Sequence, residues 1–588
     1  MSGSGPVSSN PAPIRASLPL DEFRNIGEMV KRRAALYGDD PAFTVCLPNG
    51  ITAGLSFAEA DRMSDDLATY FRTVLALERG ERLAVMLPNC LAYPLLAFGA
   101  LKAGLVLTGI NPLYTADEIA FQLRDSGAAA LVTLDLFGAR VAKAIEAVPV
   151  RVVIRASVAE FFPPLRGALV RASLRAAGRL RGCPRHWPTL GHAVRAGRRA
   201  RASRPGFVER SIAEVGPHDV ALLQYTGGTT GVPKAAMLTH HNLLANAAQL
   251  AEIAGFYWDR RRDRMLTVLP LYHIFAFQIN CLTCFWLGCG TVLVPNPRPL
   301  SNLKPAFRKF PISYSTAVNT LLKLLLKERW FREHPPRSLR MVYAGGSAVE
   351  ASVIREWAEV VGGHVTQGYG LSEASPCVTF DPLREVVEER GSDGRPRVRP
   401  ADPDADGLGL PMPMTEIRIV SEEGRVAAIG AAGEIEVRGP QVMPGYWNNP
   451  EETAAVFHDG WLRTGDIGRV NAAGRITILD RKKDLIIVSG FNVFPTQVEE
   501  CITAIQAVSE AAVVGVPDDT TGESVLACVV CTPGGSTERE IREHCREHLA
   551  AYKIPKRVVF RTELPRTAIG KVDRRSLREE ARRGAMLP

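Results

Sequence analysis

The chain has 588 residues, of which 46% are hydrophobic and 23% are charged. This composition excludes a disordered, low-complexity or collagen-like chain and a protein with many membrane spans. Because a single hydrophobic core stops growing near roughly 250–300 residues, we expect at least two domains. The 71 basic and 62 acidic side chains leave a net charge of +9, which would suit an acidic partner only if it were spread over a surface.

The excess positive charge is concentrated in one segment. Residues 155–210 contain 13 arginines, no lysine and two glutamates, a local charge of +11, so the remaining chain sums to −2. Arg171, Arg175 and Arg179 recur every fourth residue beside leucines, which predicts a basic amphipathic helix within 163–204 that suits an anionic membrane surface. A solvated cap over the core is the alternative. The segment lacks the aromatic interleaving of nucleic-acid-binding surfaces, so we expect no nucleic acid partner.

The sequence gives no sign of secretion or membrane insertion. Residues 1–20 read as a disordered tail without the apolar core of a signal peptide, and no run reaches the ~20 apolar residues of a spanning helix. We therefore expect a cytoplasmic protein, peripheral on the membrane if the basic segment binds lipid. Two CxxC pairs could together form a four-thiolate zinc site, but their apolar surroundings favour packing as small hydrophobes; the pairs are Cys281/Cys284 and Cys528/Cys531.

The order of predicted elements indicates a large α/β domain followed by a small one. Apolar runs that alternate with amphipathic stretches predict βαβ units and parallel sheets; these runs are 82–87, 129–134, 151–154, 265–269, 291–294 and 341–343. The polar residues 384–406 predict an exposed loop, and the alternating stretches GEIEVRG (433–439) and GRITILD (474–480) predict antiparallel strands. A helix near 497–504 and strands near 511–516 and 525–531 then predict a separate α+β domain.

The strongest chemical motif is the stretch YTGGTTGVPK, residues 225–234. Its glycines allow the backbone to approach a phosphate, its threonines offer hydroxyls, and Lys234 supplies a point charge. It is not a Walker loop, because the spacing differs and Ala235 follows the lysine. The chain has only 13 lysines among its 71 basic residues, so a lysine in a motif indicates that a compact ammonium is needed.

Together with further motifs in the same order, this stretch resembles the adenylate-forming (AMP-binding) superfamily, most closely its bacterial long-chain fatty acid–CoA ligases. The further motifs are LPLYHIFAF (269–277), YAGGSAV (343–349), QGYGLSEASP (367–376), TGDIG (464–468), DRKKDLIIVSGFNVFPTQVEE (480–500) and PRTAIGKVDRR (565–575). The resemblance covers about residues 20 to 580. It implies a multidomain α/β fold, with two α/β subdomains plus a β-barrel portion in a large N-terminal domain and a small mobile C-terminal α+β domain. The boundaries we expect are a tail over 1–20, the large domain over 21–479, a hinge over 480–484 and the mobile domain over 485–588.

The reaction implied by the resemblance has two halves. A fatty acid carboxylate attacks the α-phosphate of ATP and gives acyl-AMP and pyrophosphate; the thiol of coenzyme A then attacks the acyl carbonyl and expels AMP. Magnesium is the implied cofactor, and fatty acid, ATP and coenzyme A are the implied small-molecule partners. The resemblance leaves acyl chain length and oligomeric state open, with a homodimer among the alternatives.

The resemblance also assigns roles by position. The β- and γ-phosphates are implied to bind Thr226, Gly227, Gly228, Thr229, Thr230, Gly231 and Lys234, and Thr229 and Glu373 to contact Mg²⁺. The adenine is implied to lie against Gly345, Gly346, Gly368, Tyr369 and Gly370, the α-phosphate on Ser372 and the ribose on Asp466 and Arg481. Lys571 is implied to bridge carboxylate and α-phosphate, Lys483 to be the pivot, and Ser489, Gly490 and Asn492 to line the pantetheine tunnel. His273 is implied to border the acyl pocket, and Phe277 to gate the fatty acid tunnel; core packing is the alternative for both.

Two other enzyme functions and one non-enzymatic function are alternatives to this assignment. A ligase that hands the acyl group to a carrier protein tends to have a different hinge loop and an insertion, neither of which is seen here. Aryl or short-chain acids are the second enzyme alternative. A non-catalytic fatty acid-binding relative is disfavoured because the residue types that carry the chemistry are all present.

Overall fold

A computed structural model describes residues 17–176, 178, 182–226, 233–254, 258–346, 348–381, 386–390, 396–398, 407–489, 491–518, 520–532, 534–566 and 571–583. The chain forms two compact units. The main unit comprises Ser8–Glu416 and Arg438–Gly460, and the C-terminal unit contains Ile417–Val437 and Trp461–Pro588. The predicted hinge over 480–484 therefore lies inside the C-terminal unit and stays a prediction.

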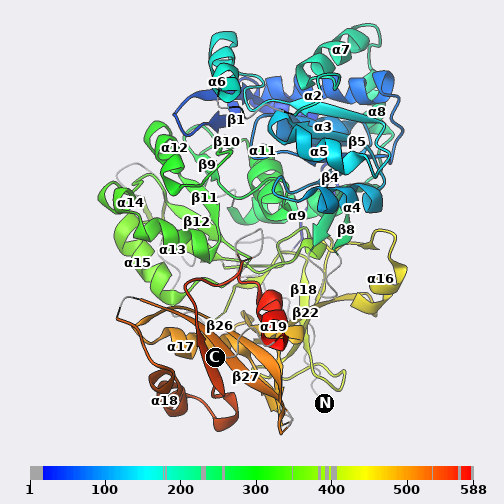
Figure 1. Cartoon of the computed structure of the whole chain (residues 1–588). Coiled ribbons are helices and arrows are strands. Elements are labelled where there is room, and N and C mark those ends of the chain that lie inside the picture. Colours follow the sequence, from blue (N-terminus) through cyan, green and yellow to red (C-terminus); the bar gives the residue numbers. More distant parts are fainter. Residues whose placement is uncertain are drawn as a thin grey trace. The chain divides into compact units, whose positions relative to one another are not determined.

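The main unit contains two mixed seven-stranded sheets (Figure 1). The first has the order β20-β8-β7-β4-β3-β5-β6, and its central strands are parallel and almost fully buried, as expected where helices cover both faces. Its strands are β3 (Arg82–Met86), β4 (Val106–Gly109), β5 (Ala128–Leu134), β6 (Val152–Ala156), β7 (Val220–Thr226), β8 (Lys234–Thr239) and β20 (Gly445–Tyr446). Helices α3 (Ala92–Lys102), α4 (Ala116–Ser126) and α5 (Gly138–Ile145) connect the parallel strands β3, β4, β5 and β6.

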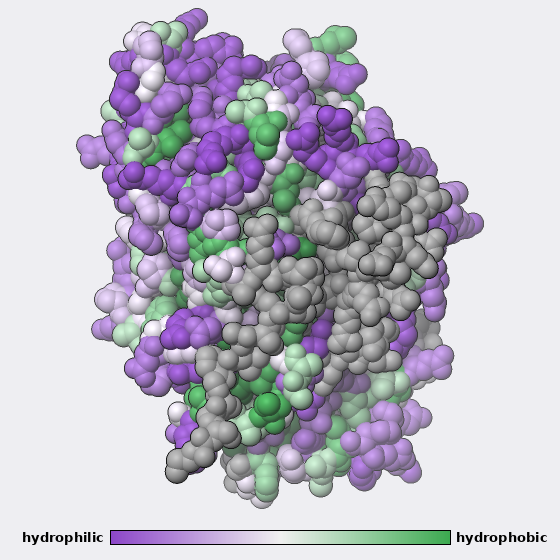
Figure 2. Space-filling model, turned by 180° about the vertical axis from the view of Figure 1, so that it is seen from behind, coloured by the Kyte–Doolittle hydropathy of each residue, from purple (hydrophilic) through white to green (hydrophobic). Residues whose placement is uncertain are grey.

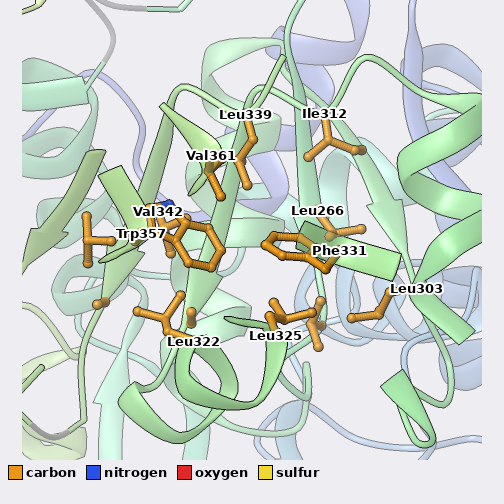
Figure 3. Packing of buried hydrophobic residues seen from close by; sticks show 14 of the residues in the cluster. Leu266, Leu303, Ile312, Leu322, Leu325, Phe331, Leu339, Val342, Trp357 and Val361 are labelled. Carbon is orange, nitrogen blue, oxygen red and sulfur yellow. The ribbon is translucent and has the colours of Figure 1, made fainter. Parts of the chain in front are cut away.

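The second sheet has the order β13-β12-β11-β9-β10-β1-β2. Trp357 and Val361 of one helix and Leu322 and Leu325 of another meet sheet residues such as Val342, and the ring of Trp357 lies 5.5 Å from that of Phe331 (Figure 3). The spacing of three or four residues on each helix places these side chains on one face. The strands are β1 (Pro41–Cys46), β2 (Thr52–Ser56), β9 (Arg264–Thr267), β10 (Gly290–Leu293), β11 (Tyr314–Ala317), β12 (Met341–Ala344) and β13 (His364–Gln367), with helices α13 (Asn319–Lys327), α14 (Arg329–Glu333) and α15 (Ala351–Val361).

Part of the basic segment is anchored in the main unit by buried carboxylates. Helix α7 (Leu190–Ala202) packs against α2 (Phe57–Thr69), where fully buried Asp66 accepts hydrogen bonds from Arg198 at 3.2 Å and from Arg201 at 2.9 Å. Gly197 permits this approach, because a Cβ at that position would lie 1.8 Å from the backbone oxygen of Asp66. Further helices of the main unit are α1 (Ile26–Tyr37), α6 (Pro164–Ala176), α8 (Phe207–Ala213), α9 (His240–Ala254), α11 (Cys284–Leu287) and α12 (Lys304–Lys309).

The C-terminal unit contains an antiparallel group of β18 (Glu416–Val420), β19 (Gly433–Arg438), β22 (Trp461–Val470) and β23 (Ile476–Arg481). A second sheet has the order β25-β24-β27-β26 with β28 beside β27. Helices α17 (Pro495–Thr503) and α18 (Glu538–His548) contribute to the core on one face, and α19 (Arg574–Arg582) to the core on the other. The strands are β24 (Ile486–Val488), β25 (Phe491–Val493), β26 (Val508–Asp518), β27 (Gly522–Cys531) and β28 (Arg557–Phe560).

The predicted strands and the C-terminal helix are confirmed within a few residues of their expected bounds. Inside the predicted loop 384–406, the structure describes an antiparallel pair, β15 (Val386–Arg390) and β16 (Pro396–Val398), and the rest of that loop lies outside the described residues. Among the described helices, none combines the length and apolar character needed to cross a membrane.

The two CxxC pairs have different surroundings. Cys281 and Cys284 are buried in helical structure, and burial raises the pKa of the Cys281 thiol far above its ordinary value. Cys528 and Cys531 lie three residues apart on β27, so they face opposite sides of the sheet: Cys528 belongs to the core under α19 and Cys531 to the core under α17 and α18. Thiols on opposite faces of one strand cannot share a metal ion.

Candidate active site

The predicted phosphate loop joins two antiparallel strands of the main unit. Thr226 is the last residue of β7 and Lys234 the first of β8, and the two are directly paired. The Thr226 hydroxyl donates to the Lys234 carbonyl at 3.4 Å. The loop residues Gly227, Gly228, Thr229, Thr230 and Gly231 lie outside the described residues.

Lys234 has an acidic partner that its motif does not contain. Its ammonium lies 2.6 Å from Oε2 of Glu452, on helix α16 (Pro450–Val456), and 5.9 Å from the centre of the Tyr446 ring. The lysine side chain is only 12% exposed. Strand β20 pairs with β8 and so brings Tyr446 beside the lysine.

Tyr446 also connects the lysine to Glu373. Its hydroxyl donates to Oε1 of Glu373 at 2.9 Å, and burial together with the charge of Glu373 raises the pKa of the phenol well above its ordinary value. Glu373 is held a second time, since its carbonyl accepts from the Met443 backbone at 2.8 Å. Within the part of the chain that the structure describes, Tyr446 is the one hydrogen-bond donor to this carboxylate. The other carboxylate oxygen suits a hard cation, so the residue fits Mg²⁺.

The predicted adenine-binding segments follow two neighbouring parallel strands. Gly345 and Gly346 follow β12, and Gly368, Tyr369 and Gly370 follow β13, so both segments lie at the same edge of the sheet. The Gly368 backbone donates to the carbonyl of Ala344, the last residue of β12, at 3.0 Å.

Side chains are restricted in this region. A Cβ at Gly370 would lie 1.7 Å from the carbonyl oxygen of Pro376, so the chain can pass here only with glycine. Tyr369 is buried, and its backbone N–H donates to the Thr379 hydroxyl at 3.2 Å. Ser372 opens the short helix η6 (Ser372–Ala374), which also carries Glu373.

His273 caps a helical turn. Its Nδ1 accepts from the backbone of Phe275 at 3.3 Å, at the start of α10 (Ile274–Ala276). Phe277 is buried and its ring lies 6.3 Å from that of Tyr93. These contacts give His273 a capping role and Phe277 a packing role, and the substrate-side roles of both stay predictions.

In the C-terminal unit, Asp466 and Arg481 face each other across β22 and β23. Arg481 Nε lies 2.7 Å from Oδ1 of Asp466, whose side chain is 3% exposed, whereas the arginine is nearly half exposed. The buried carboxylate is thus oriented by a more accessible guanidinium.

Lys571 belongs to the same electrostatic group. Burial, reinforced by the positive charges of Arg481 and Lys483 and opposed by Asp466, lowers the pKa of Lys571 to about 8. Burial is also the main cause that lowers the pKa of Lys483. The structure therefore brings together four of the predicted residues, which are separated by up to 105 positions in the sequence.

Ser489 and Asn492 lie on the hairpin β24–β25. The Ser489 backbone donates to Thr521 at 2.8 Å, and the Asn492 amide donates to Glu422 at 3.1 Å. Ile487 and Phe491 on the same hairpin are more than half exposed. Gly490 lies outside the described residues.

Two residues of this site were not predicted by the sequence analysis. Tyr446 and Glu452 contact Glu373 and Lys234 from 73 and 218 positions away. No local pattern around Tyr446 or Glu452 indicates either contact.

The comparisons with known proteins agree with these motifs. Residues 30–447 match the model of the AMP-binding enzyme family, and residues 497–571 match that of the AMP-binding enzyme C-terminal domain. Since the first match covers well over half of the chain, this protein belongs to the AMP-binding enzyme family.

Among its relatives are proteins named long-chain-fatty-acid–CoA ligase. The protein of that name from Salmonella typhimurium is 38% identical over 97% of both chains, and the one from Bacillus subtilis is 37% identical over 86% of both. Among solved structures, a fatty acyl CoA synthetase of Mycobacterium tuberculosis is 27% identical with a TM-score of 0.65, over 95% of this chain and 99% of that one. The anthranilate CoA ligase AuaEII, solved with anthranoyl-AMP, shares the fold with a TM-score of 0.79 at 24% identity, over 97% of this chain and 100% of that one.

Proposed function

We propose that this protein is an AMP-forming acid–thiol ligase that activates a long- or medium-chain fatty acid with ATP and transfers the acyl group to coenzyme A. The observation that carries the proposal is the 38% identity, over 97% of both chains, to a long-chain-fatty-acid–CoA ligase. The grouping of Lys571 with Asp466 and Arg481, and of Lys234 with Tyr446 and Glu373, supports it.

For the first half-reaction, we assign charge neutralisation to lysines and orientation to the surrounding groups. Lys234 and the phosphate loop hold the β- and γ-phosphates, and Lys571 neutralises charge between the attacking carboxylate and the α-phosphate. Glu373, together with Thr229, would hold Mg²⁺, which when bound supplies positive charge to the phosphate oxygens. Asp466 and Arg481 hold the ribose, and Ser372 the α-phosphate.

For the nucleotide base and the acyl group, we assign packing surfaces. Tyr369 stacks on the adenine between Gly345–Gly346 and Gly368–Gly370, and His273 borders the acyl pocket. In the second half-reaction the hairpin with Ser489, Gly490 and Asn492 lines the path of the pantetheine after a rotation about Lys483. The thiol then forms the new bond to the acyl carbon, and AMP leaves with the electrons of the broken anhydride bond.

A substrate panel tests the function. We expect AMP release that requires both ATP and coenzyme A, with kcat/KM for C12 to C18 fatty acids at least about tenfold above that for C2 to C4 and aromatic acids, because each added buried methylene contributes ~0.8 kcal/mol. Preference for an aryl or short-chain acid would contradict the fatty acid assignment. AMP release that needs a carrier protein in place of coenzyme A would contradict the assigned acceptor.

We further propose that α6 contacts anionic membrane surfaces. Leu165 and Leu169, one turn apart on this helix, are 76% and 60% exposed. Arg166, next to Leu165 in the chain, and Arg175, further along the helix, are also exposed. On the upper part of the face in Figure 2, hydrophobic side chains form small separate groups among hydrophilic ones. Exposed leucines beside arginines suit the boundary between lipid headgroups and acyl chains.

Sedimentation with vesicles tests this contact. We expect binding to phosphatidylglycerol vesicles and not to phosphatidylcholine vesicles, and a loss of about tenfold or more in the L165S/L169S double variant, because two apolar side chains no longer enter the membrane. L36S is the matched control, since Leu36 is 60% exposed on α1. Absence of binding, or equal binding of the double variant, would contradict the proposal. Deleting residues 163–204 would not be a clean test of membrane binding. The deletion also removes Arg198 and Arg201, the hydrogen-bond partners of buried Asp66, and would therefore destabilise the fold.

A further inference from the structure

Three ligand-type side chains come together on the C-terminal unit, and none of them is among the residues assigned to the reaction. Cys501 lies on α17, and His544 and His548 lie one turn apart on α18. One potential ligand atom from each residue lies within 4.8 Å of the others. The two helices pack against each other, as Figure 1 also shows. We propose that these three residues form a binding site for one Zn²⁺ or a similar divalent transition-metal cation that links α17 to α18.

The spacing is close to that of a tetrahedral site. With Zn–N near 2.0–2.1 Å and Zn–S near 2.3 Å, ligand atoms of a tetrahedral zinc lie roughly 3.3–3.8 Å apart. Since no two ligand atoms are more than 4.8 Å apart, the cluster has to contract by at most about 1.5 Å on binding. His548 is exposed at the end of α18, so a small shift of this side chain that keeps its hydrogen bond to the His544 carbonyl can supply this movement. One thiolate and two imidazoles leave the fourth position to water.

The hydrogen bonds of the cluster favour metal binding over other uses of these groups. Nδ1 of His548 lies 2.9 Å from the backbone carbonyl of His544. A carbonyl only accepts, so Nδ1 carries the proton and Nε2 of the neutral ring carries the lone pair. Metal-binding histidines commonly have such an outer partner, which fixes the ring and raises its basicity.

A second thiol supports Cys501 as the ligand. Cys545, the residue after His544, is fully buried and hydrogen-bonds the thiol of Cys501. A cation that binds Cys501 must displace the thiol proton, since the thiolate is the form that binds metal ions.

The chemistry of the donors selects the class of metal. Sulfur and imidazole nitrogen suit zinc, cobalt and related cations, whereas magnesium and calcium require oxygen ligands. The cluster is half-buried at Cys501 and His544 and open to solvent at His548, which provides an entry path. The CxxC pairs are less suitable: Cys528 and Cys531 face opposite sides of β27, and Cys281 and Cys284 are fully buried.

Cobalt titration of the full-length protein in the presence of a phosphine reductant tests the site. After treatment with chelator, we expect one equivalent of Co²⁺ to bind, with a thiolate-to-cobalt charge-transfer band in the near ultraviolet and d–d bands of tetrahedral cobalt. Zinc should bleach these bands by displacement. C501S should abolish the charge-transfer band, and H548Q should weaken binding by about 100-fold or more, because losing a ligand exceeds the 10–100-fold cost of losing an outer partner.

The matched control is C531S, which removes another half-buried thiol of the same unit. This variant should bind cobalt like the unaltered protein. Absence of a charge-transfer band in the unaltered protein, or an equal band in C501S, would overturn the proposal. H548Q keeps the assay informative if C501S is unstable, since His548 is exposed; unchanged cobalt affinity in H548Q would also overturn it.

Discussion

Replacing Lys571 by alanine is expected to lower adenylation by about 100- to 1,000-fold, the usual effect of removing one group that stabilises transition-state charge. Formation of acyl-CoA from supplied acyl-adenylate and coenzyme A should stay within about threefold of the unaltered protein, because the proposed role of Lys571 ends with the first half-reaction. Fatty-acid-dependent ATP–pyrophosphate exchange measures the first quantity, and thioester formation measures the second. Full activity from acid and ATP in this variant would refute the role.

The pH dependence of adenylation provides an independent readout. Lys571 has a pKa lowered to about 8, so its charged form predominates below that value and is lost above it. Adenylation should therefore fall as the pH rises through 8, and at pH 9 only about one tenth of the lysine remains protonated. K571R should be slower at every pH but should not show this fall, since arginine keeps its charge over the whole range. An identical fall in K571R would assign it to another group.

Replacing Glu373 by glutamine is expected to lower adenylation by about 100-fold or more and to raise the Mg²⁺ concentration required for half-maximal rate. The substitution keeps size and hydrogen bonding but removes the charge that a hard cation needs. The measurement is the rate of ATP–pyrophosphate exchange against Mg²⁺ at fixed ATP.

Y446F is the matched control for this prediction. It removes only the hydroxyl that donates to Glu373 at 2.9 Å. The carboxylate charge remains, so we expect a loss of about tenfold or less, in the range of one neutral hydrogen bond. Unchanged Mg²⁺ dependence in E373Q would contradict the assignment of Glu373 as a metal ligand.

The sequence predicted the elements that depend on local patterns. Alternating or continuous apolar runs predicted strands such as β5 and β27. In a strand, side chains on the same face recur every second residue, and parallel strands buried on both faces are apolar throughout. Glycine motifs follow β12 and β13 at one edge of the sheet. Glycine is needed at Gly370 because the backbone there lies too close to the Pro376 carbonyl for a side chain. The roles of these residues came from family resemblance.

Partners that are distant in the sequence were not predictable in the same way. Glu452 pairs with Lys234, and Tyr446 with Glu373, only because β20 joins the edge of a sheet formed more than 200 residues earlier. The anchoring of α7 by Asp66 has the same origin: the segment 155–210 was recognised as basic, but the buried carboxylate that anchors α7 lies on α2. Likewise, composition cannot show that Cys528 and Cys531 face opposite sides of β27.

The ion pair between Lys234 and Glu452 has a consequence for nucleotide affinity. The lysine at the end of the phosphate loop already has an internal counter-ion at 2.6 Å, provided by the same unit. A triphosphate that approaches this lysine must compete with a carboxylate of like charge. Its binding free energy is therefore reduced by the cost of separating the ion pair or by repulsion from Glu452. The position of Glu452 on α16 therefore weakens the attraction of Lys234 for a phosphate group.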